Sequence, residues 1–140
     1  MSVTKKQLLE ELNKDLEWEY AAAIQYVQHA AAIAGAKYEG IQKELIIHSQ
    51  EEMAHAVLLS DQIDFLGGTP TVDVEKRAIS GNSLQMLRQD IQGEDLAIRR
   101  YHKRIDQAEA LKLYGLRRVL EDILLQEEEH KRDLAMVLDS

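Results

Sequence analysis

Six residues of this sequence have the types and spacing of a metal site. Each half of the chain contains a Glu-x-x-His motif, and a lone glutamate lies 33 residues before the glutamate of each motif. On a helix, residues three positions apart point in nearly the same direction, so the carboxylate and imidazole of one motif can bind the same ion. The six residues are Glu19, Glu52 and His55 in the first half, and Glu94, Glu127 and His130 in the second.

The elements that position these residues are predicted to be helices. The 140 residues include one proline and seven glycines, and Ala, Leu, Glu, Lys and Gln are abundant, a composition typical of an all-α protein. The length suits a single domain, residues 1–140, with a sizeable core. Because cysteine is absent, disulfides, thiolate metal sites and thiol catalysis are excluded, and metal ligands must be oxygen and nitrogen.

The charge of the chain restricts its partners. The formal net charge of -8 argues against non-specific nucleic-acid binding, which requires Lys and Arg to neutralise phosphates, and favours attraction of cations. The first residues contain no apolar signal core, and no later run is long and uncharged enough to span a membrane. We therefore expect a cytoplasmic protein without a membrane segment.

Apolar residues at steps of three and four predict an inward-facing stripe on each of four helices. All six candidate ligands fall within these stripes, where a glutamate or histidine is rarely buried without a partner. The only long irregular segment is Gly67 to Asn82, which could run along the side of a bundle. The predicted helices are residues 5–34, 41–66 and 84–110, followed by a fourth after a break near 111–115.

The sequence also indicates an internal duplication of a helix hairpin. Tyr26 and Tyr101 are 75 residues apart, as are Gly40 and Gly115 and the three pairs of candidate ligands. Within each hairpin the lone glutamate and the motif lie at similar distances from the turn, and therefore at the same height. Two hairpins packed face to face would bring four carboxylates and two imidazoles together. Burying these charges requires protonation or compensation, which two divalent cations would provide. Iron or manganese suits such ligands, and zinc can bind them too.

This constellation resembles the ferritin-like di-iron superfamily, and the stretch EEMAHAVLLSDQIDFLGGTP is most similar to bacterioferritins. The resemblance implies an antiparallel four-helix bundle whose second connection crosses the length of the bundle. It also implies two iron ions per chain, with Glu19 and Glu94 as terminal ligands, Glu52 and Glu127 as bridging ligands, and one imidazole for each ion. The implied reaction is oxidation of Fe(II) by dioxygen or peroxide.

Three positions test how far the resemblance extends. Met53 stands where bacterioferritins have a haem-ligating methionine, but an exposed or interface methionine is the alternative and haem is not predicted. The sequence ends ten residues after His130, so we do not expect the short fifth helix of bacterioferritins, and a closed storage shell is not predicted. Rubrerythrins carry a further ligand glutamate where this chain has Ala97, and they have a Cys-rich electron-transfer domain that we do not expect here. A rubrerythrin-like peroxidase is therefore the weaker assignment.

Several other residues are candidates for supporting roles. Tyr26 and Tyr101 each follow a candidate ligand by seven residues and either hydrogen-bond a ligand or pack in the core. His48 and Asp90, each one turn before a candidate ligand, have the same two interpretations. Trp18, together with Met53, indicates a subunit interface of a homo-oligomer. Glu51, Glu121, Glu128 and Glu129 are expected to be solvated, and His29 and His102 to be exposed. A solvated or subunit-contact face is expected for the cluster Arg99, Arg100, Lys103 and Arg104.

The sequence thus favours a di-iron ferroxidase that acts in iron handling or protection from oxidants. Two alternatives remain open from the residues alone. The site could belong to a non-catalytic metal- or haem-binding assembly protein. A plain helical interaction module would instead have to bury six polar groups without ions.

Overall fold

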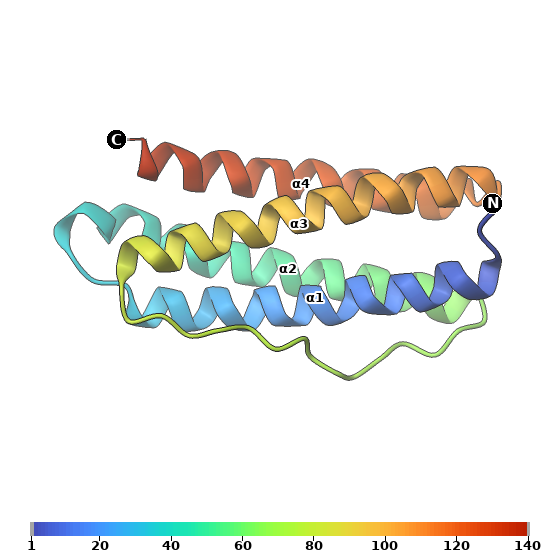
Figure 1. Cartoon of the computed structure of the whole chain (residues 1–140), viewed down its shortest axis with the longest axis horizontal. Coiled ribbons are helices and arrows are strands. Elements are labelled where there is room, and N and C mark those ends of the chain that lie inside the picture. The colour runs from blue at the N-terminus through green and yellow to red at the C-terminus, as the bar shows by residue number, and fades with distance from the viewer. Residues whose placement is uncertain (1, 140) are drawn as a thin grey trace.

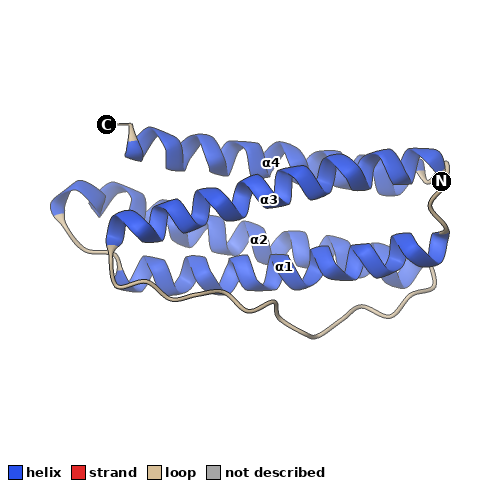
Figure 2. Cartoon of the chain, viewed as in Figure 1, coloured by secondary structure: helices blue, strands red, loops and turns tan. Residues whose placement is uncertain are grey.

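The computed structural model describes residues 2–139, and within that range it contains four long α-helices and no β-strand (Figures 1 and 2). The all-α prediction is confirmed. Helices α1 and α2 form one antiparallel hairpin, closed by a short 3-10 turn, and α3 and α4 form the other (Figure 1). The elements are α1 Lys5–Ala32, η1 Ala36–Tyr38, α2 Glu39–Phe65, α3 Ser83–Ala110 and α4 Tyr114–Leu138.

Side chains fix the starts of two helices. Thr4 caps α1, and its hydroxyl accepts a hydrogen bond from the Gln7 backbone while the Gln7 side chain accepts one from the Thr4 backbone. Asn82 accepts from the Gln85 backbone at 2.9 Å and caps α3. These caps satisfy backbone N–H groups that have no partner within the helix.

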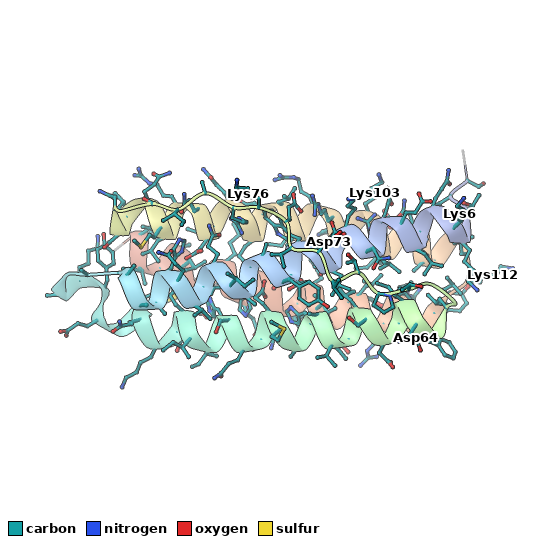
Figure 3. The ribbon with its side chains drawn as sticks, turned by 90° about the horizontal axis from the view of Figure 1, so that it is seen from below. Lys6, Asp64, Asp73, Lys76, Lys103 and Lys112 are labelled. Atoms are coloured by element: carbon teal, nitrogen blue, oxygen red, sulfur yellow. The ribbon has the colours of Figure 1, made fainter. Side chains whose placement is uncertain are left out.

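The long segment between α2 and α3 runs the length of the bundle along α1, so that α3 starts at the same end as α2 (Figure 1). In the view turned toward this crossover, Asp73 lies over α1 and Lys76 lies near α3 (Figure 3). The Glu75 backbone donates to the Glu17 carbonyl at 3.3 Å, and the Arg77 guanidinium lies 4.3 Å from the centre of the Trp18 ring. The implied crossover is therefore present.

The core has two apolar clusters, one toward each end of the bundle, and the polar residues of interest lie between them. Leucine, isoleucine and alanine side chains dominate both clusters, and removing their surface from water is the main stabilising contribution to such a fold. In residues 2–139, none of the helices has the length and apolarity needed to cross a membrane. Fully buried members include Leu12, Leu16, Leu59, Ile63 and Leu120 in the first cluster, and Leu45, Leu87 and Leu134 in the second.

Two buried polar pairs join α1 to α3 at positions related by the duplication. Arg104 donates to both oxygens of Asp15, from Nε at 2.6 Å and from Nη2 at 3.0 Å. His29 Nδ1 lies 2.9 Å from both oxygens of Asp90. The expectations that His29 is exposed and that Arg104 belongs to a solvated or subunit-contact face were therefore wrong. Apolar periodicity marks only one side of a helix, whereas these helices bury a wider face on which paired polar groups are tolerated.

The pair of Arg104 and Asp15 gives a test of this packing. Arg104→Met is expected to lower the free energy of unfolding by about 3–5 kcal/mol, because it leaves a buried carboxylate without its partner. Urea unfolding followed by circular dichroism measures the change. Arg99→Met, an exposed neighbour on the same helix, is the control and should change stability by less than about 0.5 kcal/mol. Equal losses in the two variants would contradict this assignment.

Candidate metal centre

The bundle brings all six predicted residues together in its middle layer, and we call this group the six-residue cluster. Helices α1 and α3 each supply one glutamate, and α2 and α4 each supply a Glu-x-x-His. The cluster divides into two overlapping groups of four that share Glu52 and Glu127, and in each group one ligand atom per residue lies within 4.8 Å of the others. Every member is at most 2% exposed. The groups are Glu19, Glu52, His55 and Glu127, and Glu52, Glu94, Glu127 and His130.

The inward-facing atoms of the cluster are buried and lack hydrogen-bond partners among the described residues. Nδ1 of His55 and of His130 has no hydrogen-bond partner among the described residues. At least one oxygen of each glutamate also lacks a partner there. The two nitrogens lie 3.2–3.5 Å from carboxylate oxygens of the cluster. Buried polar groups in folded proteins are normally satisfied. Cations that bind oxygen and nitrogen would satisfy all of these atoms at once, so the residues present fit a two-ion centre.

Burial and mutual repulsion give the cluster a strong affinity for protons or other cations. Burial raises the pKa of Glu52, Glu94 and Glu127, and neighbouring carboxylates add to the increase. Burial alone would lower the pKa of the imidazoles, but the facing carboxylates outweigh it and raise the pKa of His55 to about 9 and of His130 to about 10. Any metal ion must therefore displace protons from this cluster.

Each lone glutamate of the cluster is held by a tyrosine from the opposite half of the chain. Tyr26 of α1 donates to Glu94 of α3 at 2.8 Å, and Tyr101 of α3 donates to Glu19 of α1 at 2.5 Å. Both phenols are buried, which raises their pKa well above the usual value, so they remain donors. The tyrosines thus orient the two glutamates that are not shared between the groups.

A second pair of residues links the outer nitrogens of the two cluster histidines. His55 Nε2 lies 2.5 Å from Gln126 Oε1, the amide of Gln126 donates to Glu51, and Glu51 Oε1 lies 3.3 Å from His130 Nε2. These contacts direct both Nδ1 atoms toward the carboxylates. Glu51 was expected from the sequence to be solvated, and Gln126 was not among the predicted residues. The available signal was position, because each residue directly precedes the glutamate of a motif and the two are 75 residues apart.

The remaining candidates occupy different surroundings. His48 is 1% exposed and its ring stacks on that of His130, with 4.1 Å between the centroids. Burial lowers the pKa of His48 to about 4, and repulsion from His130 adds to this, so its imidazole is neutral at pH 7. Asp90 contacts His29 rather than the cluster. Met53 is 44% exposed and lines a surface hollow between α1 and α2.

Trp18 packs partly within the chain, and the subunit interface expected there stays a prediction. Its ring lies under the guanidinium groups of Arg77 and Arg100, at 4.3 and 5.3 Å from the ring centre. Its indole N–H donates to the Gly93 carbonyl at 3.3 Å. The tryptophan therefore joins α1 to α3 and to the crossover.

Fold and site together define a four-helix bundle with a paired carboxylate–histidine cluster. The chain belongs to the ferritin-like domain family, whose model matches residues 9–140. Over 127 residues it is 25% identical to a bacterioferritin of Desulfovibrio desulfuricans, covering 90% of this chain and 71% of that protein. Among solved structures, a ferritin-like di-iron-carboxylate protein from Bacillus anthracis is 35% identical with a TM-score of 0.93, covering 99% of both chains. A dodecameric thioferritin from Bacteroides fragilis, a bacterioferritin-related protein, is 30% identical with a TM-score of 0.91, covering 99% of this chain and 88% of that one.

The raised pKa values predict how metal-free protein responds to pH. Between about pH 6 and 9 the folded chain holds more protons than the unfolded chain, because Glu52, Glu94, Glu127 and both cluster histidines have raised pKa values. The free energy of unfolding of metal-free protein should therefore fall as pH rises through this range. Thermal unfolding in the presence of a chelator measures the slope. Glu127→Gln should show a shallower slope, and a slope that does not differ between the two proteins would contradict the assignment.

The contacts of Gln126 and Glu51 with the outer nitrogens of the cluster histidines predict a separate effect on metal affinity. Gln126→Leu removes the contacts to His55 and Glu51, so divalent metal ions should bind about 10–100-fold more weakly. Competition with a chromophoric zinc chelator measures the affinity. Gln92→Leu, an exposed position on α3, is the matched control and should leave it unchanged. Equal affinities of the two variants would show that the link does not orient the histidines.

Proposed function

We propose that this protein is a ferroxidase, which oxidises Fe(II) to Fe(III) with dioxygen or peroxide at the six-residue cluster. The proposed role is in iron handling or protection from oxidants. The observation that carries the proposal is the pair of four-residue groups that share two glutamates, since these groups would hold two ions close to one another. Membership of the ferritin-like family and the likeness to a di-iron-carboxylate protein support iron, with manganese and zinc as alternatives.

The residues of the cluster would have distinct tasks. Glu52 and Glu127 belong to both groups and are proposed as the bridging carboxylates, while Glu19 and Glu94 are proposed as terminal ligands. With iron held by these residues, Fe(II) would supply the electrons that reduce the oxidant and would become Fe(III). The surrounding negative charge stabilises Fe(III) more than Fe(II), because the attraction grows with the charge of the ion. The carboxylates therefore favour oxidation.

The chain would also control the release of protons and the access of water at the six-residue cluster. Binding of an ion would require His55 and His130 to release the proton on Nδ1, while their Nε2 atoms would keep their contacts with Gln126 and Glu51. Apolar clusters on both sides of the middle layer restrict water. Low access of water strengthens the electrostatic interactions within the cluster.

We further propose that the chain forms a homo-oligomer. Apolar side chains on α1 and α2 are exposed in the single chain, where they would be costly to leave in water as a group. Similarity to a dodecameric protein supports assembly of copies. A non-catalytic metal- or haem-binding assembly is the alternative function, and Met53 lies on this surface. The exposed residues include Ile24, Val27, Met53 and Val57.

Glu127→Gln tests the ferroxidase proposal with little change in side-chain volume. Because Glu127 belongs to both groups, its loss should slow Fe(II) oxidation at least about 100-fold while the helical content is retained. The measurement is the appearance of Fe(III) absorbance after Fe(II)-loaded protein is mixed with oxygen. Glu128→Gln, the exposed neighbour, should oxidise iron at the wild-type rate. Wild-type protein that binds iron but does not oxidise it would instead favour the non-catalytic alternative.

A further inference from the structure

Three residues outside the six-residue cluster have metal-binding types and converge on one point of the surface between α2 and α4. Glu44 and His48 are four residues apart on α2 and so share a face, and Asp133 faces them from α4. One ligand atom of each lies within 4.8 Å of the others. His48 Nε2 and Asp133 Oδ2 are 3.2 Å apart. We call this group the α2–α4 triad.

The imidazole of the triad is held rigidly, while the carboxylates remain open to solvent. The His48 ring packs edge-on against Tyr26, with 5.1 Å between centroids, and stacks on His130 at 4.1 Å. Only 1% of His48 is exposed, whereas 45% of the Asp133 side chain is exposed and Glu44 is partly exposed. A fixed nitrogen donor beside two accessible carboxylates leaves coordination positions for water, as an exchangeable ion requires.

The internal duplication provides an independent observation. At the positions 75 residues away, the other half of the chain has an apolar residue for every member of the triad. Ile123, which corresponds to His48, is 1% exposed and belongs to the apolar core. The fold therefore does not need polar groups at these positions, and a buried histidine in place of isoleucine loses apolar packing. The counterparts of Glu44, His48 and Asp133 are Val119, Ile123 and Leu58.

We propose that Glu44, His48 and Asp133 form a third binding site, which holds one divalent first-row transition-metal ion on the surface beside the six-residue cluster. One imidazole nitrogen and two carboxylates suit Fe(II), Mn(II), Co(II) or Zn(II). With fewer protein ligands and more exposure, this site binds its ion more weakly than the cluster does. None of its residues belongs to the cluster, so the proposal does not depend on the oxidation of iron.

Anaerobic titration of the full chain with Co(II), a probe that is not oxidised under these conditions, tests the site. Wild-type protein should show a weak phase of about one equivalent per chain after the tight phase. The double variant Glu44→Gln, Asp133→Asn should lose the weak phase and keep the tight one. It changes only partly exposed carboxylates, so its folding should be preserved. His48→Ile, which copies the duplicated half, should have the same effect.

Two controls separate this site from other binding. Asp61→Asn removes an exposed carboxylate elsewhere on α2 and should leave both phases unchanged. The double variant Glu52→Gln, Glu127→Gln should lose the tight phase and keep the weak one, which distinguishes failure of the triad from failure of the cluster. A weak phase that is absent from wild-type protein, or that survives removal of both triad carboxylates, would overturn the proposal.

Discussion

Repulsion among four buried carboxylates is the interaction on which the rest of this structure depends. Like charges in a medium of low polarity repel strongly, and these carboxylates are buried in the middle of the bundle. The carboxylates are tolerated because cationic or proton-donating groups lie next to them. Two imidazoles face them and two phenols donate to them from the opposite helices. The apolar clusters contribute the free energy of folding that such a layer consumes.

The sequence was sufficient to predict the helices and the six-residue cluster because both depend on regular spacing. A glutamate such as Glu19 stands out when its neighbours three and four positions away are apolar, and the duplication repeats that contrast at Glu94. His29 and Arg104 could not be found in this way. Each is buried because of a carboxylate on another helix, and a contact between distant segments leaves no periodic signal. Glu51 was misjudged for the same reason, since its partners lie on α4.

The two halves of the chain are alike where they form the cluster and differ in what surrounds it. The Glu51 carboxylate contacts Nε2 of His130, whereas the Gln126 amide oxygen contacts Nε2 of His55. Arg104, which contacts Asp15, corresponds by the duplication to His29, which contacts Asp90. A carboxylate behind an imidazole increases the electron density on its opposite nitrogen more than an amide oxygen does. The two halves of the cluster are therefore electronically different despite their matching residues.

The crossover has a further consequence for how the bundle assembles. Each helix hairpin can form from local contacts, whereas the crossover lets the second hairpin pack on the first only after a long stretch of chain has been ordered. Each four-residue group takes three members from one hairpin and a single glutamate from the other. Neither group is complete until the hairpins have docked. Formation of the ligand sets and closure of the bundle are consequently a single event. An ion that binds all four residues of a group would hold the two hairpins together.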